Sequence, residues 1–440
     1  MITTKNGASA PFVFASTGDQ LIVNGVISNV TAPTTETIVS AVAGVTVTNK
    51  GIVATLDATV ASIDLQLGGT ITNSASGYLF GKLLSGGSLS LTNDGTITGI
   101  LAVTYHDGDA GSTVVNHGLF AYLPNPPVTV ITLGGGNDAV VNSGTIVGDV
   151  VLGEGTNTYD GRGGTVVGTV FGGAGDDTYF LTQITNLSDS GGTDLINARM
   201  SYTLGVGFEN LTLVGFGNFT GTGNSSGNLM TGNTSSNVLN GQGGDDTLIG
   251  GLGNDTLNGG TGVDSLDGGS GDDRLNTGYG SDFATGGDGN DRLIGDNGSD
   301  TLQGGNGNDT LDGGVGSDVL NGGVGNDVLI GGSFGSDRMT GGGGADSFVF
   351  LGVDDSLATH AADVITDFLA GTDKIDLSAV IDGDLLFVDS GDFSLSAASV
   401  RWFQTGGDTL VQVDLDHNGT ADMQINLLGL MSLGADSFAL

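Results

Sequence analysis

The chain has 440 residues and carries 10 Lys and Arg against 49 Asp and Glu, which gives a formal net charge of −39 at pH 7. Proteins that bind nucleic-acid phosphates need a basic surface, so this charge balance excludes nucleic acid as a partner. The absence of cysteine rules out disulfide bonds. No stretch approaches the ~18 apolar residues that a membrane-spanning helix requires.

A turn that contains asparagine, followed by an apolar strand, recurs through the first 150 residues. The asparagines lie 20 to 26 residues apart, at Asn24, Asn49, Asn73, Asn93, Asn116 and Asn142. This spacing predicts a three-faced, right-handed parallel β-helix in which stacked asparagines hydrogen-bond along the axis. A β-sandwich, whose strands also alternate with turn residues, is the alternative.

Residues 104–111, with the sequence TYHDGDAG, offer groups that could act as a base, an acid and a cation ligand of a polysaccharide-modifying enzyme. These groups are Tyr105, His106, Asp107 and Asp109. A site that acts on an acidic sugar should also gather basic side chains, and Lys50 and Lys82 are the only ones nearby. An exposed loop is therefore the favoured interpretation.

Two glycine-rich fragments precede the regular repeats. LGGGND ends at Asp138, and GGAGDDTYF contains Asp177. We expect one or two cation sites near these aspartates. Two later units carry Asn228 and Asn237 where aspartate would lie, which predicts capping coils with weak or no cation binding.

From residue 241 to 349 the chain repeats a nine-residue unit, Gly-Gly-x-Gly-x-Asp-x-Leu-x. The three glycines allow positive φ and a tight turn, and the tail forms a short strand whose leucine faces a core. If two units make one coil, aspartates 18 residues apart stack in two rows. One row contains Asp246, Asp264, Asp282, Asp300 and Asp318, and the other contains Asp255, Asp273, Asp291, Asp309 and Asp327.

The gaps between stacked turns then hold carboxylate and carbonyl oxygens. An all-oxygen site of flexible coordination favours Ca²⁺ over Mg²⁺, and the lack of cysteine and scarcity of histidine argue against Zn²⁺ or Cu²⁺. Without cations, the crowded carboxylates should repel one another and keep the block open. The repeat therefore predicts multiple calcium ions that the chain needs in order to fold.

Some units depart from the pattern, and these departures should weaken single sites. Thr277 replaces a first glycine, Ala284 replaces an inward leucine and Asp296 replaces a second glycine. One extra residue after position 331 predicts a bulge near Phe334. Two further aspartates follow, Asp337 and, in what we expect to be the last turn, Asp346.

The nine-residue unit resembles the repeat of secreted RTX, or haemolysin-type, calcium-binding proteins, and residues 345–380 resemble the serralysin-type carboxyl-terminal domain that follows such repeats. The resemblance implies a parallel β-roll. Calcium sites in extracellular modules typically have a Kd of about 10⁻⁴ to 10⁻³ M, so calcium outside the cell would drive folding. The ligands that the resemblance implies are Asp246, Asp255, Asp264, Asp273, Asp282, Asp291, Asp300, Asp309, Asp318, Asp327, Asp337, Asp346 and Asp177.

Residues 414–422, DLDHNGTAD, begin like an EF-hand calcium loop. The closing glutamate is missing, because Ile425 occupies the twelfth position, and the flanking residues alternate as strands rather than helices. A plain hairpin turn is therefore favoured over a calcium site.

The chain ends DSFAL, which is similar to the uncleaved terminal signals read by type I secretion channels, and residues 1–14 contain no apolar core of a signal peptide. We therefore expect an extracellular protein exported by the type I secretion apparatus.

These features together predict an all-β, elongated parallel β-solenoid. We expect an N-terminal β-helix-like region at residues 1–130, a transition region at 131–240, the calcium-binding β-roll at 241–350 and a C-terminal β-rich cap at 351–440. Helix is scarce, and only residues 363–368 and the end of the chain are helix-tolerant.

The predicted function is that of a secreted calcium-binding structural protein, a surface-layer, adhesin or matrix component. Its expected partners are calcium ions, the secretion apparatus and either other copies of itself or a cell-surface polysaccharide. The sequence contains no HExxH motif, no GxSxG motif and no Walker loop, which excludes a zinc protease and favours a non-enzymatic role. The alternative is a β-helix lyase or epimerase with a repeat module for secretion and folding.

Overall fold

The computed structural model describes residues 12–14, 20–23, 26–29, 38–40, 44–55, 61–103, 111–122, 128–358, 362–380 and 385–440. In these residues the only helices are the short 3-10 helices η1 (Val353–Asp355) and η2 (Ala435–Ser437), and the rest of the regular structure is β-strand. No helix of this described part is long and apolar enough to cross a membrane. The chain forms two compact units, Met1–Met200 with Gly205–Asn210 (unit 1) and Ser201–Leu204 with Leu211–Leu440 (unit 2).

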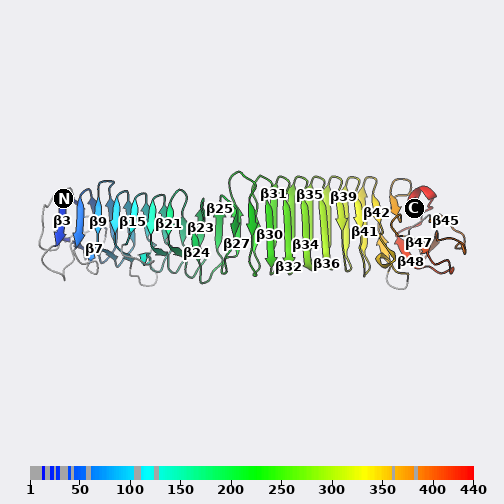
Figure 1. Ribbon diagram of the computed structural model, residues 1–440, viewed down its shortest axis with the longest axis horizontal. Helices are drawn as coiled ribbons and strands as arrows, with labels where there is room; N and C mark the ends of the chain where they lie inside the picture. The colour runs from blue at the N-terminus through cyan, green and yellow to red at the C-terminus, as the bar shows by residue number, and fades with distance from the viewer. Residues whose placement is uncertain are drawn as a thin grey trace. The chain divides into compact units, whose positions relative to one another are not determined.

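Unit 1 is a three-faced parallel β-helix, whose coils stack one after another from the N-terminal, blue end (Figure 1). The first face contains β2 (Gln20–Val23), β5 (Val45–Asn49), β8 (Gly69–Asn73), β11 (Leu89–Asn93), β14 (Thr113–Asn116), β17 (Ala139–Asn142), β20 (Thr158–Asp160), β23 (Thr178–Leu181) and β25 (Leu195–Ala198). The second contains β1 (Phe12–Phe14), β4 (Ile38–Ser40), β7 (Ala61–Leu65), β10 (Lys82–Ser85), β13 (Leu101–Val103), β16 (Thr129–Thr132), β19 (Asp149–Val151), β22 (Thr169–Phe171) and β24 (Asn186–Ser188). The third contains β3 (Val26–Asn29), β6 (Ile52–Thr55), β9 (Tyr78–Phe80), β12 (Thr96–Thr98), β15 (Leu119–Ala121), β18 (Thr145–Val147) and β21 (Thr165–Val167).

The core of unit 1 is a stack of apolar side chains in register. Val47, Ile71, Leu91 and Val114 pair from strand to strand, and each is at most 1% exposed. Burial of each such side chain contributes about 1.5–3 kcal/mol. The described strand pairs of this unit are parallel, which confirms the β-helix and is incompatible with the β-sandwich alternative.

The stacked asparagines confirm the predicted hydrogen-bonded row. Asn49 Nδ2 donates to Asn73 Oδ1 at 2.8 Å, and Asn73 donates in the same way to Asn93 at 2.8 Å. The row continues from Asn93 to Asn116 at 2.7 Å and from Asn116 to Asn142 at 2.8 Å. All five amides are completely buried, so each bond satisfies groups that water cannot reach. Asn24 lies outside the described residues.

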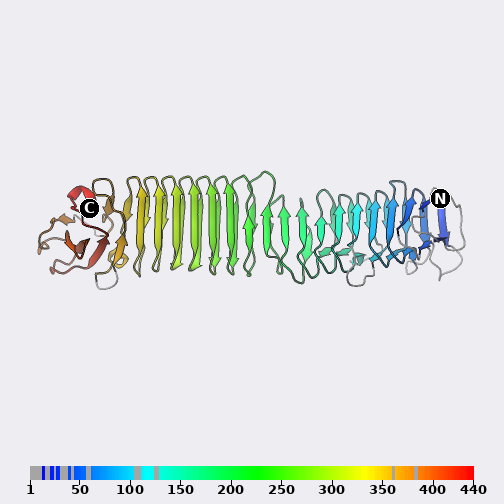
Figure 2. The same ribbon diagram turned by 180° about the vertical axis from the view of Figure 1, so that it is seen from behind.

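Unit 2 is a two-faced parallel β-roll with 18 residues per coil (Figure 2). One face contains β26 (Tyr202–Thr203), β28 (Thr220–Thr222), β30 (Val238–Gly243), β32 (Thr256–Thr261), β34 (Arg274–Gly280), β36 (Arg292–Gly298), β38 (Thr310–Asp312), β40 (Val328–Ile330), β42 (Ser347–Val349), β44 (Lys374–Asp376) and β49 (Phe438–Ala439). The other contains β29 (Leu229–Thr231), β31 (Thr247–Leu252), β33 (Ser265–Ser270), β35 (Phe283–Asp288), β37 (Thr301–Asn306), β39 (Val319–Val324), β41 (Arg338–Gly343) and β43 (Asp363–Ile365). The repeat leucines form the core between the two faces; Leu257, Leu275 and Leu293 are in register and fully buried.

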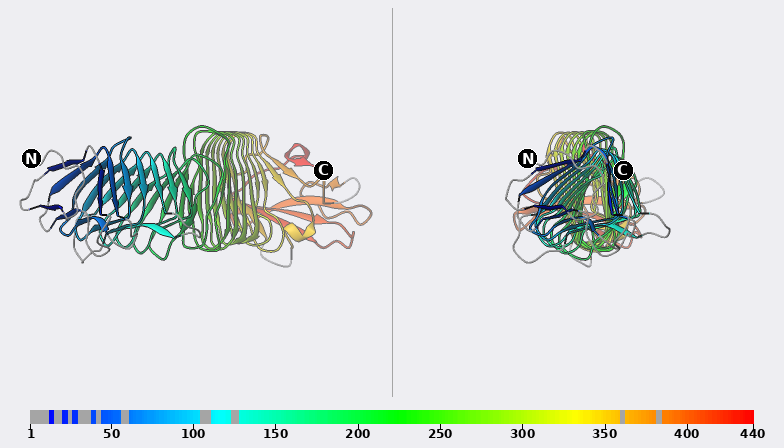
Figure 3. Two further views of the ribbon diagram at one scale, coloured as in Figure 1. Left: turned by 60° about the vertical axis from the view of Figure 1, so that its left-hand side comes forward. Right: turned by 90° about the vertical axis from the view of Figure 1, so that its left-hand side faces the viewer.

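The C-terminal cap extends the second face of the roll. Strand β48 (Met423–Leu427) pairs in parallel with β43, and β47 (Asp408–Asp414) and β46 (Ser399–Thr405) follow as antiparallel neighbours, visible at the red end in Figure 3. The helix-tolerant interpretation of residues 363–368 was wrong, because β43 is a further rung of the roll. The chain end instead contains η2.

The predicted bulge is confirmed at Phe334. This residue adopts a φ of 61°, and the rung that contains it is 19 residues long rather than 18. The extra residue is accommodated in the turn, so the strands on both sides keep their register.

Candidate metal sites

The repeat aspartates form two hydrogen-bonded rows along the turns of the roll. The backbone N–H of Asp246 donates to Asp264 Oδ1 at 2.8 Å, and Asp264 donates to Asp282 in the same way at 2.8 Å. The other row contains the equivalent bond from Asp273 to Asp291 at 2.8 Å. These bonds confirm the predicted 18-residue stacking. Each carboxylate is fixed through Oδ1 by the preceding coil.

The second oxygen of each of these carboxylates is buried without a partner. This holds for Oδ2 of Asp246, Asp255, Asp264, Asp273, Asp282, Asp291, Asp300, Asp309, Asp318 and Asp327. All ten residues are at most 3% exposed. An unpartnered ionised oxygen in such a place costs several kcal/mol, so it requires a cation or a proton.

Burial also changes the acidity of the row. Desolvation raises the pKa of Asp255 and Asp291 to about 6, although a backbone N–H partly offsets the effect at each. The pKa of Asp273 and of Asp300 rises to about 7, because neighbouring carboxylates add to the desolvation. The rows thus hold carboxyl groups that retain protons close to neutral pH unless a cation replaces them.

The first glycine of each unit leaves the space in which such a cation fits. A Cβ placed on Gly250 would lie 2.5 Å from Asp255 Oδ2 and 2.6 Å from the carbonyl oxygen of Gly268, one coil further on. Gly268 repeats this arrangement, with Asp273 Oδ2 at 2.5 Å and the Gly286 oxygen at 2.7 Å. Two oxygens from successive coils therefore converge on a space that any side chain would fill. This all-oxygen donor set fits Ca²⁺.

The glycine positions differ from the prediction in one respect. The second and fourth glycines, such as Gly251 and Gly253, have positive φ values of 109° and 103°. The first glycine, Gly250, does not, and its role is to leave room rather than to permit the turn. Asp296 adopts a φ of 65° at a second position, where glycine would be unstrained.

Thr277 fills the space that a first glycine leaves open. Its buried hydroxyl donates to the carbonyl oxygen of Gly295 at 2.9 Å, which is the oxygen that would face a cation beside Asp282. The site at this unit is therefore occupied by a side chain.

Both rows extend beyond the expected last turn at Asp346. Asp337 N–H donates to Asp363 Oδ1 at 2.8 Å, and Asp346 N–H donates to Asp373 Oδ1 at 3.1 Å. The prediction that Asp346 ends the stack was wrong, because β43 and β44 add one rung to each row. Burial raises the pKa of Asp363 to about 8, and its Oδ2 has no partner.

A similar row lies in unit 1. Asp138 N–H donates to Asn157 Oδ1 at 2.8 Å, Asn157 N–H to Asp177 at 2.7 Å and Asp177 N–H to Asp194 at 2.8 Å. Oδ2 of each of the three aspartates is buried and unpartnered. Both aspartates named from the sequence, Asp138 and Asp177, thus belong to one structure.

A further carboxylate, that of Asp189, lies beside this row. Asp189 lies beside Asp177 and Asp194, with one oxygen of each within 4.8 Å of the others. Tyr179 donates its hydroxyl to Asp189 Oδ2 at 2.8 Å. Burial raises the pKa of Asp177 to about 6 and that of Asp194 to about 7, and the neighbouring carboxylates add to both shifts.

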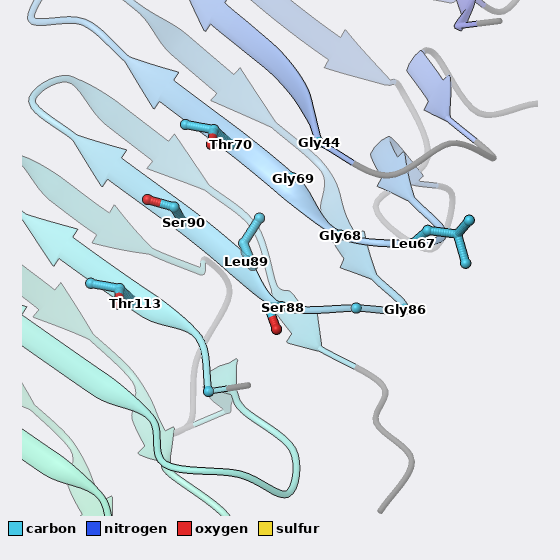
Figure 4. Close-up of a pocket in the computed structure, with 12 residues that line it drawn as sticks. Gly44, Leu67, Gly68, Gly69, Thr70, Gly86, Ser88, Leu89, Ser90 and Thr113 are labelled. Atoms are coloured by element: carbon cyan, nitrogen blue, oxygen red, sulfur yellow. The ribbon is translucent and has the colours of Figure 1, made fainter. Parts of the chain in front are cut away.

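The candidate enzymatic residues Tyr105, His106, Asp107 and Asp109 lie outside the described residues. In unit 1, residues of neighbouring coils line a depression of about 500 Å³ (Figure 4). Its lining includes Leu67, Gly68, Thr70, Ser88 and Thr113. No titratable side chain is among the described residues that line it.

The chain matches one protein family and is similar to parts of two known proteins. The family described as Peptidase M10 serralysin C terminal matches residues 128–438. Serralysin A of Dickeya chrysanthemi is 37% identical over 91 residues, which cover 20% of this chain and 19% of that protein, so the match spans about a fifth of its length. The solution structure of the AlgE6R3 subunit from the Azotobacter vinelandii mannuronan C5-epimerase is 25% identical; the match covers 40% of this chain and 78% of that one, with a TM-score of 0.21.

Proposed function

Since the chain belongs to the Peptidase M10 serralysin C-terminal family, whose RTX repeats form calcium-binding β-rolls, we propose that it is a secreted structural protein of the cell surface that folds and assembles on binding extracellular Ca²⁺. Repeats of this type are typical of extracellular proteins that use the type I route, which supports the proposed location. The described part contains no helix that could span a membrane.

The observation that carries the proposal is the uninterrupted series of buried, unpartnered Oδ2 atoms from Asp246 to Asp327. We assign the aspartates predicted from the sequence as ligands, except Asp282, whose cation space Thr277 fills. We add Asp194 and Asp363, whose Oδ2 atoms are also buried without a partner. In each repeat, Oδ1 would fix the carboxylate through the neighbouring coil while Oδ2 and a first-glycine carbonyl would face the ion. Bound calcium would supply the positive charge that this interior lacks.

Calcium would then act as a folding switch. Inside the cell, where calcium is far below the Kd of about 10⁻⁴ to 10⁻³ M expected for such sites, carboxylate repulsion and desolvation oppose the roll. Outside the cell, the binding free energy becomes folding free energy. The switch explains how one chain could pass a secretion channel unfolded and become rigid afterwards.

The surface of unit 1 supports a structural role. On its first face, Thr46, Thr70, Ser90 and Thr113 lie in register on neighbouring strands, and they form a regular polar row. A surface of this kind suits contact with a repetitive partner such as a polysaccharide or another copy of the chain.

Light scattering and electron microscopy of the purified full chain test the proposed assembly. Chelator-cleared protein should scatter as a single chain, and millimolar calcium should produce sheets or filaments that a chelator disperses. Magnesium at the same concentration is the control. A calcium-folded protein that stays monomeric at all concentrations would contradict assembly and leave the adhesin role, which a binding assay on immobilised cell-surface polysaccharide would then test.

A polysaccharide-modifying activity in the β-helix is the second candidate. The depression in unit 1 is the observation that favours it (Figure 4). Incubation of the calcium-loaded chain with acidic polysaccharides, followed by detection of unsaturated or epimerised sugars, tests this activity. A product that is lost on replacement of His106 and Asp107 would support it.

A further inference from the structure

We propose that the turn between β47 and β48 is a calcium site outside the repeats, formed by Asp414, Asp416 and Asp422. The expected hairpin is confirmed, since the two strands are antiparallel neighbours. The hairpin nevertheless gathers three carboxylates, and one oxygen of each lies within 4.8 Å of the others. In the part of the chain that the structure describes, no basic side chain forms an ion pair with any of the three.

Asp414 provides an independent indication of a ligand. The residue is completely buried, and its Oδ1 has no hydrogen-bond partner, whereas Oδ2 accepts the backbone N–H of Gly419 at 2.9 Å. One oxygen therefore holds the turn, as in the repeats, and the other is left without a partner inside a cluster of negative charge. A buried carboxylate in this situation needs a cation.

The other two carboxylates are held in place by the turn itself. Asp416 accepts the backbone N–H of Asn418 at 3.1 Å and its side-chain amide at 2.8 Å. Asp422 Oδ2 accepts the backbone N–H of Leu415 at 2.8 Å. Because each carboxylate oxygen has two lone pairs, these bonds leave capacity for a metal.

The ligand atoms of the cluster indicate which ion it would bind. Its ligands are hard carboxylate oxygens, which suit Ca²⁺ better than Mg²⁺, because Ca²⁺ accepts irregular coordination whereas Mg²⁺ requires near-ideal octahedral geometry. Asp414, Asp416 and Asn418 occupy alternating positions like the first three ligands of an EF-hand loop. Asp422 supplies a carboxylate on the far side of the turn, so Ile425 at the twelfth position does not prevent binding.

The site is connected to the end of the aspartate rows. Asp422 is followed by β48, which pairs Ile425 with Asp363 of β43. Asp363 in turn accepts the N–H of Asp337, the preceding member of its row. An ion in the hairpin would therefore order the strand that covers the last rung of the roll.

Native mass spectrometry and hydrogen exchange of the full chain test this site. Asp416 is exposed, so Asp416→Asn should fold; Asp422→Asn is a second variant, and Asp392→Asn removes an exposed carboxylate from the same cap as a control. We expect both hairpin variants to bind one calcium ion fewer than the wild type and the control. Calcium should also no longer protect the amides of residues 409–427, while protection of the repeats persists.

Because hydrogen exchange reports on the hairpin and the repeats separately, the experiment distinguishes failure of the hairpin site from failure of the proposed function. Equal ion counts and equal calcium-dependent protection of residues 409–427 in wild type, Asp416→Asn and Asp422→Asn would overturn the hairpin site even if the repeats respond. A response of the hairpin alone would instead support the hairpin site and contradict the calcium-dependent roll.

Discussion

Substitution of Asp291, in the middle of the roll, separates the two roles of a row aspartate. Its Oδ1 accepts the N–H of Asp273 at 2.8 Å, and its buried Oδ2 has no partner. Asp291→Asn keeps an acceptor oxygen but removes the charge, and the fold already has asparagine at the equivalent positions Asn228 and Asn237. Asp291→Ala removes both functions and leaves the buried N–H of Asp273 unsatisfied.

The expected magnitudes differ accordingly. Loss of one ion costs about 2.7 kcal/mol when calcium is at 100 times its Kd. An orphaned buried N–H costs about 1–3 kcal/mol more, so Asp291→Ala should be the more damaging change. In chelator at about pH 6, Asp291→Asn should instead be more stable than the wild type, because it removes a carboxylate that burial disfavours. Burial raises the pKa of Asp291 to about 6.

Urea unfolding, followed by circular dichroism with and without calcium, measures these effects. Asp288→Asn is the matched control, because it makes the same charge change on an exposed residue of the same repeat and should shift stability by less than about 0.5 kcal/mol. The reasoning is refuted if Asp291→Asn behaves like the control in calcium, or if it destabilises the chain equally with and without the ion.

Three further predictions address other parts of the chain. Thr277→Gly should add one bound calcium ion by native mass spectrometry, because it vacates the space beside Asp282; an unchanged count would contradict the role assigned to the first glycine. Asn93→Ala should destabilise unit 1 by about 2–5 kcal/mol, since it removes the Oδ1 acceptor of Asn73 Nδ2 and leaves the buried Oδ1 of Asn116 without its donor. It should leave the number of bound ions unchanged. For the ion-free roll, the row carboxyls have folded pKa values of about 6 to 7 against an ordinary 3.8, so the folded form binds extra protons in this window. The stability of the ion-free roll should be highest below about pH 4 and should be lost as pH rises through about 6 to 7, which circular dichroism in chelator can measure. Calcium affinity should fall as pH decreases through the same range. An ion-free stability that increases with pH would contradict this prediction.

The period of the sequence was sufficient to predict the roll. A nine-residue unit with aspartate at one phase fixes the 18-residue coil, the two rows and the inward leucines, because a solenoid repeats its local geometry. The buried asparagines of unit 1 were predictable for the same reason, although their spacing varies. In both units, the residue types that recur in the sequence are the ones that stack on neighbouring coils.

Aspartates that lie outside the nine-residue repeat were not predicted from the sequence. Asp363 and Asp373 lie 26 and 27 residues after their partners, so insertions place them out of phase although they occupy the same rows. Asp189 reaches its cluster from a position with no repeat. Asp194 carries a recognisable signal, the preceding Gly191 and Gly192, and Asp363 is followed by an apolar alternation like that of a repeat strand.

The carboxylate cluster in the hairpin of the cap was also not predictable from the sequence, for a different reason. The motif at residues 414–422 lacks helices and a closing glutamate, which argued for a simple turn. The turn is present, but only its three-dimensional arrangement shows that Asp422 approaches Asp414 and Asp416. Cross-loop distances of this kind are not encoded in a spacing rule.

A calcium titration of chelator-cleared full-length protein, followed by circular dichroism at pH 8, tests the central claim most directly. We predict a cooperative gain of β structure between about 10⁻⁴ and 10⁻³ M calcium, in the range of extracellular sites, with no comparable gain in magnesium. A chain that has its full β structure in chelator, or that never gains it with calcium, would show that the buried aspartate oxygens are not the calcium ligands on which folding depends.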